Sequence, residues 1–585
     1  MTSRPAVGLP VVELGGGAVS TPLLPEVWRV AGLLADDSVA SRIAEADPSV
    51  WGPAPRAPEP RPEADTDPRA GSAEDPRAGS AEDPRVGSAS AEDGLGWAAL
   101  PRTSRPLIGQ VDALREAFRV AGAARVLLVG DARWTLGARV LASVAVPAGS
   151  GASPRSLLTV VDSPDPGAVS HALATDLDGI VLVVADPFGD TEWVAAVHEL
   201  LAEALAAEIG PERAHARTVV LTEAGSRLDE RARATGSVVI TTERDVPGVF
   251  SVLGAPGIVP AGLAGAPVGT VLDEAREVVE LLAADDAANP ALELAGALVA
   301  TADGPVRIVP PLDRPELAEW VAALVGAAGG RPVLVDPTDD TGLPFGPVFA
   351  PATAEEPTED TPTAAPEPGT DADAVRTGGS TGAELLLWQI AAAAAARLLD
   401  ADAFAPDAPA SPVRAPSPDP GPVLREIGTD GIVTTHAGDW FSGAADEALQ
   451  ALVRAVPEDG HLAVWGWLDP ADDASVAVLR AELARRTGLP VTFGWGPRDR
   501  AVLAPFRRDT PRPGAVLLLT GDAPDDLAPD PGPALASLAL REAGVVAADI
   551  ATRGVPVLRL HLHDRVAGLV VLARAVQALQ LPQTP

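Results

Sequence analysis

Two histidines that lie close together in the sequence are the first candidates for chemistry. His561 and His563 alternate with leucines in VLRLHLHD, and the two-residue period of a strand places both imidazoles on one face. Two imidazoles placed in this way can hold a metal ion, but a zinc site takes at least three protein ligands. Asp564 follows directly, and we expect it to point to the opposite face or to lie at the strand end. The sequence therefore predicts no metal site, and we expect no cofactor.

The remaining residue types exclude several kinds of catalysis. The chain has no cysteine and no tyrosine, and its 44 basic residues are all arginine. Thiol nucleophiles, Schiff-base lysines and tyrosine acids are therefore absent. No G-x-S-x-G, P-loop, H-E-x-x-H or complete G-x-G-x-x-G context occurs. The other histidines lie in helical or loop contexts or at strand ends without a supporting motif: His171, His198, His215, His436 and His461.

The charge of the chain restricts its partners and its location. A net charge of -37 and a pI near 4.5 oppose binding to nucleic acid and to anionic membranes, so we expect neither partner. The first residues, MTSRPAVGLPVVELGGG, do not resemble a signal peptide. The longest apolar run, AELLLWQIAAAAAA, is too short to cross a bilayer. We therefore expect a cytoplasmic protein.

Apolar strand patterns alternate with helical segments along most of the 585 residues. In the first half the strands are RVLLVG, LLTVVDS, IVLVVAD, TVVLTEA and SVVITTE. In the second half they are PVRIVPP, PVLVDP, GIVTTHA, HLAVWGWL, VTFGWGP, AVLLLTG and VPVLRLHLH. Buried strands that alternate with helices are typical of parallel sheets. The predicted fold is α/β, with two successive doubly wound lobes, parallel sheets and flanking helices.

Polar segments interrupt this pattern and divide the chain. Residues 53–93 contain PRAGSAED twice and a degenerate third copy, which has nothing to bury and predicts a disordered insert. Residues 336–382 are acidic and rich in Pro and Thr, and 405–422 are rich in Pro, so we expect two further disordered inserts. The predicted parts are an N-terminal segment packing on the core (1–52), a first α/β domain (94–295) and a second one (296–335 and 383–580).

Several segments resemble one enzyme family in their order and spacing. TVVDSPDPGAVSHAL, TVVLTEAGSRLDERA and GIVPAGLAGAPVGTVLDEA are similar to segments that frame the sugar-phosphate site of glucose-6-phosphate isomerases of the actinobacterial type. The resemblance covers nearly all of the chain outside the inserts and implies two sugar-isomerase (SIS) domains. Members of that family interconvert glucose 6-phosphate and fructose 6-phosphate. The reaction needs an anion cradle, a base, a charge stabiliser and a ring-opening acid.

The cradle that this resemblance implies is altered. The family's S-K-S-G-x-T-x-E loop corresponds here to ADPFGDTE, in which Gly189 and Glu192 keep the pattern. Pro187 removes an N–H donor, and Asp186 adds negative charge where a dianion would lie. Thr191 offers a hydroxyl to a phosphate or, alternatively, serves as a helix N-cap.

The other loops depart from the family in the same way. The family's G-G-S-S-L becomes ARWTL, in which Arg133 could replace a phosphate contact or form an ordinary ion pair, and Thr135 offers a hydroxyl. The position of the stabilising arginine is Val249, next to Ser251, and Arg244 lies five residues away.

The positions of the base and of the ring-opening group are also changed. No carboxylate occurs at 320–335, where the family has its catalytic glutamate, and Glu319 is the nearest one. Ala501 stands at the ring-opening histidine, followed by Arg507 and Arg508. Arginine cannot give up a proton near neutral pH, although this pair could bind an anion or form a surface charge cluster.

We therefore predict no catalytic residues and an isomerase-like protein without isomerase activity. Its role would be regulation, assembly or weak sugar-phosphate binding, with a homodimer or a paralogue as possible partner. An active isomerase that uses relocated groups such as Glu319 or Arg244 is the alternative, and a purely structural protein is a third hypothesis. The candidate sugar-phosphate contacts are Arg133, Thr135, Thr191, Ser251, Arg507 and Arg508.

Overall fold

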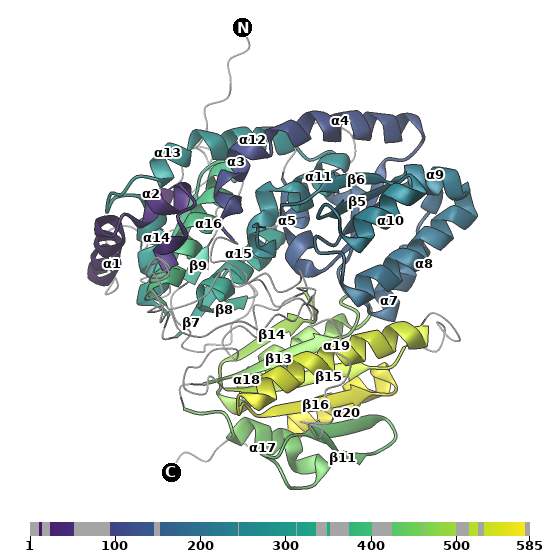
Figure 1. The fold of residues 1–585 in the computed structure, drawn as a ribbon. Helices are drawn as coiled ribbons and strands as arrows, with labels where there is room; N and C mark the ends of the chain where they lie inside the picture. The colour runs from purple at the N-terminus through teal and green to yellow at the C-terminus, as the bar shows by residue number, and fades with distance from the viewer. Residues whose placement is uncertain are drawn as a thin grey trace, which may run out of the picture.

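The fold is that of a computed structural model, and Figure 1 shows it as a ribbon. It describes residues 11–14, 24–51, 94–144, 153–243, 245–302, 304–311, 313–334, 348–350, 374–399, 424–458, 460–498, 514–523 and 532–579. The predicted inserts at 53–93 and 405–422 lie outside these residues. Among the helices described, none is both long enough and apolar enough to cross a membrane.

The first sheet confirms the parallel α/β pattern predicted for the first half of the chain. Its five strands follow the order β3-β2-β4-β5-β6, and every neighbouring pair is parallel. The strands are β2 (Arg125–Gly130), β3 (Leu158–Val161), β4 (Ile180–Ala185), β5 (Thr218–Thr222) and β6 (Val238–Thr241). This order reverses direction between β2 and β4, and ligands of doubly wound sheets bind where the strand order reverses.

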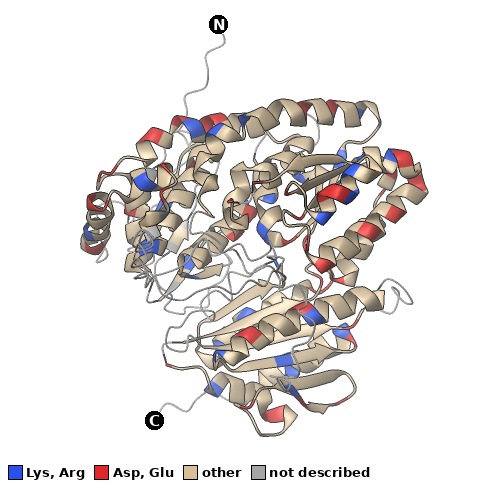
Figure 2. Ribbon diagram, in the orientation of Figure 1, with Lys and Arg blue, Asp and Glu red and all other residues tan. Residues whose placement is uncertain are grey.

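Helices cover both faces of the first sheet. Successive residues of its strands point to opposite faces, and both sets are buried. One face packs against α4 (Arg105–Val120), α5 (Ala132–Ala142) and α11 (Ala255–Leu263). The other packs against α7 (Pro166–Leu173), α8 (Glu192–Ile209) and α10 (Arg227–Thr235). Helix α8 carries the exposed Glu192, Glu199, Glu203 and Glu208. Figure 2 shows the acidic positions of the ribbon in red.

A second sheet joins segments that are far apart in the sequence. Its order is β1-β10-β9-β7-β8, and β1 alone is antiparallel to its neighbour. The strands are β1 (Val11–Leu14), β7 (Pro305–Ile308), β8 (Arg331–Leu334), β9 (Val348–Ala350) and β10 (Ala374–Gly378). The prediction of disorder throughout 336–382 is thus wrong in part, because β9, β10 and the start of the next helix lie within it.

Four helices surround this second sheet. They are α1 (Leu24–Asp36), α14 (Pro290–Ala300), α15 (Pro315–Ala328) and α16 (Thr381–Leu398). The last of these is the apolar run noted in the sequence, and it is buried on all sides from Gly382 to Ala396. Its small alanines let α12 (Val268–Glu277), α14 and α15 pack closely around it.

The third sheet, at the bottom of Figure 1, has the order β11-β12-β16-β15-β13-β14. The four strands from β16 to β14 are parallel, and β11 and β12 are antiparallel additions. The strands are β11 (Arg425–Thr429), β12 (Val433–Ala437), β13 (His461–Trp467), β14 (Val491–Trp495), β15 (Gly514–Gly521) and β16 (Val557–Leu562). The sequence predicted these strands except β11.

One face of the third sheet packs against α17 (Ala448–Arg454), α18 (Val478–Thr487) and α20 (Arg565–Ala578). The other face packs against α19 (Gly532–Thr552). Leu535 and Leu538 of this helix also belong to the buried cluster between the first sheet and α7, α8 and α10. The remaining short helices are α2 (Val39–Ala44), α3 (Leu100–Thr103), α6 (Pro154–Leu157), α9 (Pro211–Ala216), α12 (Val268–Glu277) and α13 (Val279–Leu282).

The boundaries of the predicted domains do not coincide with the three sheets. Residues 296–335 supply β7 and β8 to the second sheet, whereas 424–579 build the third. The N-terminal segment contributes β1 to the second sheet, and Val27, Val30 and Leu34 of α1 lie in the same buried cluster as the first sheet's inner face. The predicted second domain therefore extends over two sheets, and strands of both halves of the chain share one core.

A buried arginine connects the first and third sheets where the carboxyl ends of their strands meet. Arg565, at the start of α20, donates from its two terminal nitrogens to Asp165 at 2.8 Å and to Asp473 at 2.9 Å. Its Nε donates to the backbone carbonyl of Asp522 at 2.8 Å. Burial opposes the charge of Arg565, but the two carboxylates outweigh it and hold the pKa of the guanidinium above its ordinary value.

We expect Arg565→Met to destabilise the protein by about 3–5 kcal/mol, because it leaves two buried carboxylates without their cation. The midpoint of urea unfolding, followed by circular dichroism, measures this loss. Arg485→Met is the matched control, since Arg485 forms an exposed ion pair with Glu482 and its loss should move the midpoint little. Equal shifts in the two variants would show that Arg565 does not hold the two sheets together.

Candidate functional site

The loops after β2 and β4 meet at the point where the strand order of the first sheet reverses. Trp134, in the first turn of α5, and Phe188, after β4, contact each other edge to face with ring centroids 5.9 Å apart. The 3₁₀ helix η4 (Gly248–Leu253) lies against the same turn, because a Cβ at Gly248 would be 2.6 Å from the Cβ of Arg133. The structure thus gathers the elements that carry Arg133, Thr135, Thr191 and Ser251.

The loop after β4 binds its own carboxylate. Asp186 Oδ1 accepts hydrogen bonds from the Gly189 N–H at 3.2 Å and the Thr191 hydroxyl at 3.1 Å, and Oδ2 accepts from the Thr191 N–H at 3.1 Å. Gly189 permits this tight loop through its positive φ of 67°. Burial raises the pKa of Asp186, while the hydrogen bonds from Thr191 and Gly189 oppose the rise. Backbone N–H groups and hydroxyls are the donors that commonly hold a phosphate. In this loop such donors bind the Asp186 carboxylate.

The loop after β2 repeats this arrangement. Asp131 caps α5, and its Oδ1 accepts from the Arg133 N–H at 3.1 Å and from Arg133 Nε at 2.9 Å. Both side chains are buried, at 1% and 8% exposure. The predicted phosphate contact Arg133 is thus held in a buried ion pair, which was the alternative interpretation of the sequence. An aspartate directly after a strand and before a helix is the signal that could have identified Asp131.

The other predicted contacts of this region are three hydroxyls, and two of them belong to buried residues. Thr135 is fully buried, and its hydroxyl has no hydrogen-bond partner within the described part of the chain. The Ser251 hydroxyl donates to the Gly248 carbonyl at 2.6 Å, inside η4. Thr191 occupies the N-cap position of α8, although its side chain donates to Asp186 and does not cap the helix. The hydroxyls of Ser251 and Thr191 are thus engaged within the protein.

Comparison with known proteins gives a partial match in sequence. No family model matches the chain. A glucose-6-phosphate isomerase from Rubrobacter xylanophilus is 31% identical over 210 residues, which is 34% of this chain and 48% of that enzyme. Over these 210 residues the chain is similar to a glucose-6-phosphate isomerase. Its match spans about half the length of the isomerase.

Solved structures resemble this chain only loosely. A hypothetical protein from Thermus thermophilus aligns over 97% of this chain and 92% of its own, with 15% identity and a TM-score of 0.40. A glucose-6-phosphate isomerase from Chlamydia trachomatis aligns over 51% of this chain and 70% of its own, with 14% identity and a TM-score of 0.40. A putative phosphosugar isomerase from Silicibacter pomeroyi aligns over 52% and 96%, with 15% identity and a TM-score of 0.35.

The segment in which the resemblance places the stabilising arginine is built into the packing of this chain. The backbone carbonyl of Val249, the residue predicted to stand at that position, accepts from Trp320 Nε1 at 2.9 Å. The carbonyl of the next residue, Phe250, accepts from Gln389 Nε2 at 2.7 Å, and its ring is fully buried. Side chains of α15 and α16 therefore hold η4 in place.

The groups proposed as relocated catalysts are either paired or outside the described residues. Glu319 forms an ion pair with Arg139 of α5, with 2.6 Å between Arg139 Nη1 and the carboxylate. Arg244, Ala501, Arg507 and Arg508 lie outside the residues that the structure describes, so their predicted roles stay predictions.

The sequence did not reveal the polar groups that face the first sheet from the third. Arg498, after β14, binds both carboxylate oxygens of Asp162, after β3, at 2.9 and 3.1 Å. Asp469, after β13, lies 3.5 Å from Nδ1 of His171 in α7. Each of these contacts joins residues from different halves of the chain, and no local pattern marks them. Carboxylates follow β3 and β13, so this region carries negative charge of its own.

Replacement of Asp186 tests whether its carboxylate organises the loop after β4. We expect Asp186→Ala to destabilise the protein by about 1–3 kcal/mol, because it leaves the N–H group and the hydroxyl of Thr191 without their acceptor. The Gly189 N–H keeps its bond to the Asp186 backbone carbonyl. Asp190→Ala is the control, since Asp190 is an exposed carboxylate in the same loop. Both midpoints are measured by chemical denaturation, and identical values would contradict the assigned role of Asp186.

Proposed function

We propose that this chain is a catalytically inactive relative of glucose-6-phosphate isomerase that acts in regulation or assembly, in the cytoplasm, and binds sugar phosphates weakly at most. The observation that carries the proposal is the position of the Asp186 carboxylate among the donors of the loop after β4. Two unit charges 4 Å apart interact by about 4 kcal/mol at an effective dielectric constant of 20. A phosphate dianion beside Asp186 would meet this repulsion and compete for the same hydrogen bonds.

The changes at the catalytic positions support the same proposal. A hydrophobic side chain at Val249 cannot stabilise an enediolate, and the Glu319 carboxylate is already paired with Arg139. Loss of a general base alone costs about 10²–10⁴ in rate. The proposed partner is a second copy of this chain or an intact paralogue of the isomerase. Sedimentation of the chain alone, and mixed with such an isomerase, distinguishes these two assemblies.

We predict no conversion of fructose 6-phosphate to glucose 6-phosphate in an assay coupled to glucose-6-phosphate dehydrogenase. The rate should equal that of a mock purification. A turnover above about 1 per second lies in the ordinary enzyme range and would overturn the proposal. If Glu319→Gln abolished such a turnover while Glu316→Gln did not, the alternative of an active isomerase with relocated groups would replace it.

Binding of fructose 6-phosphate tests, separately from catalysis, whether the Asp186 carboxylate repels a phosphate. We expect millimolar fructose 6-phosphate to leave the melting temperature of the wild-type protein nearly unchanged, because a ligand stabilises only when its concentration exceeds the dissociation constant. Asp186→Ser removes the competing carboxylate and adds a hydroxyl, so this variant should be stabilised by the same ligand. Asp190→Ser lowers the net negative charge equally and should behave like the wild type. A large shift of the wild-type protein at micromolar ligand would contradict the prediction.

A further inference from the structure

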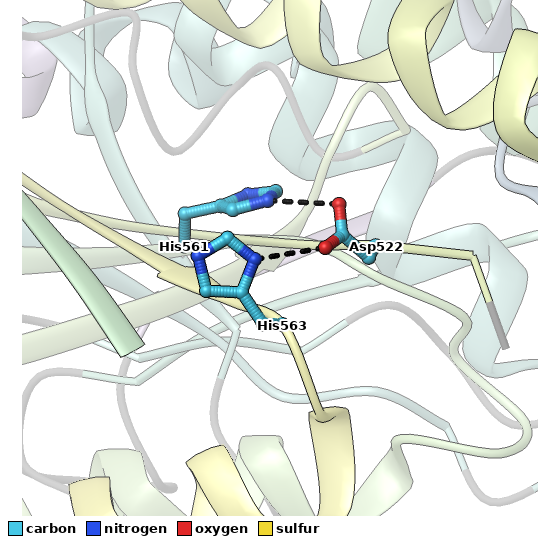
Figure 3. A group of neighbouring side chains, drawn as sticks. All are labelled: Asp522, His561 and His563. Atoms are coloured by element: carbon cyan, nitrogen blue, oxygen red, sulfur yellow. Dashed lines mark hydrogen bonds and ion pairs between the residues drawn. The ribbon is translucent and has the colours of Figure 1, made fainter. Parts of the chain in front are cut away.

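Three side chains with metal-binding atoms converge at the carboxyl ends of β15 and β16. His561 Nε2 lies 3.0 Å from Asp522 Oδ1, and His563 Nδ1 lies 2.9 Å from Asp522 Oδ2, as Figure 3 shows. The sequence suggested the two histidines without a third ligand, and the structure brings Asp522 next to both of them. Asp522 comes from the neighbouring strand, where the pairing of Thr520 with His561 and of Gly521 with Leu562 brings it beside His563.

The outer nitrogen of each imidazole contacts a threonine hydroxyl. His561 Nδ1 lies 3.0 Å from Thr520 Oγ1, and His563 Nε2 lies 2.8 Å from Thr434 Oγ1. Partners of this kind orient the ring of a metal-binding histidine and fix its tautomer. Each imidazole therefore has one nitrogen engaged by a threonine and the other directed at the Asp522 carboxylate.

The hydrogen bonds around Thr434 decide which nitrogen of His563 carries the proton. The Thr434 hydroxyl donates to Thr429 Oγ1 at 3.1 Å, so its oxygen accepts from the Nε2–H of His563. In a neutral imidazole the other nitrogen, Nδ1, then presents a lone pair. That lone pair faces a carboxylate oxygen at 2.9 Å, an arrangement that needs a cation or a second proton between the two atoms.

The surroundings hold the three groups in place and leave one side open. Arg565 Nε donates to the Asp522 carbonyl, while its terminal nitrogens are neutralised by Asp165 and Asp473. The His561 side chain is 10% exposed, whereas those of Asp522 and His563 are 51% and 41% exposed. An ion could therefore enter from solvent and keep positions for water beside three protein ligands.

We propose that Asp522, His561 and His563 form a binding site for a divalent transition-metal ion of the zinc type. Two imidazole nitrogens and one carboxylate favour Zn²⁺, Co²⁺ or Ni²⁺ over Mg²⁺ or Ca²⁺, which prefer oxygen ligands. The ligand atoms lie within 4.8 Å of one another, so a small movement of the exposed His563 and Asp522 side chains suffices to close around an ion. The site lies on the third sheet and is independent of the proposed loss of isomerase activity.

A second cluster of the described residues serves as the comparison. His171, Asp469 and Asp472 also lie close together, but the two nitrogens of the one imidazole face different carboxylates at 3.5 and 3.6 Å. The two nitrogens of one imidazole point away from each other, so one ion binds only one of them. This cluster therefore supplies one nitrogen ligand where the proposed site supplies two.

The test is zinc titration of the full chain after treatment with a chelator, by isothermal calorimetry and by competition with a chromogenic chelator. We expect one Zn²⁺ per chain, and visible absorption bands when Co²⁺ replaces it. His563→Gln and Asp522→Asn should each weaken binding at least tenfold, and His171→Gln should leave it unchanged. Thr434→Val, which removes no ligand atom, should weaken binding by about 10–100-fold through the loss of its contact with His563.

Circular dichroism and melting temperatures without metal establish that each variant folds. Absence of stoichiometric zinc binding by the folded wild-type protein would overturn the proposal. A proton, and not a metal ion, would then lie between His563 and Asp522. Binding that survives His563→Gln and Asp522→Asn, or that His171→Gln removes, would place the ion elsewhere and equally overturn it.

Discussion

The buried charge of Arg565 is the constraint on which the relative placement of the first and third sheets depends. One guanidinium binds Asp165 at the start of α7, Asp473 after β13 and the carbonyl of Asp522 after β15. A buried ion of this kind is costly unless its partners are present, so an arrangement that separated these three chain segments would be destabilised. The same contact fixes the end of β15, and it thereby positions Asp522 beside the two histidines of β16.

In the region where the first sheet reverses its strand order, the turns bind carboxylates of the protein itself. Asp131 and Asp186 both follow strands of this sheet, and each accepts hydrogen bonds from the turn that comes after it. These contacts keep the loops tight and satisfy their backbone donors from within the protein. A scaffold of this kind can preserve its surface and its partners after the loss of its chemistry, as we propose for this chain.

Local patterns in the sequence predicted most of the fold because buried parallel strands are continuous apolar runs. Each of the five strands of the first sheet lies within a predicted segment. The strands that were missed are short or lie in polar surroundings, as β9 and β10 do within an acidic region rich in Pro and Thr. The antiparallel pairing of β1 with β10 leaves no local signal.

The candidate sites were predicted less well, since their contacts join distant segments. An aspartate such as Asp131 can be identified as a helix cap from its neighbours alone. The partnership of Asp522 with His561 and His563 becomes visible only from the register between β15 and β16. The ion pairs of Arg498 and Arg565 similarly depend on how two separate sheets face each other, and such pairings need the tertiary structure.

The pairing of β1 with β10 also affects how the chain is synthesised. Leu14 pairs with Val375, so β1 leaves the ribosome long before its partner strand exists. At about 5–20 residues per second the delay is on the order of 20–70 s. During this interval the nascent N-terminal strand has an unpaired edge, which is the kind of surface that associates with other chains. Completion of the second sheet must therefore be a late event in the biogenesis of the protein.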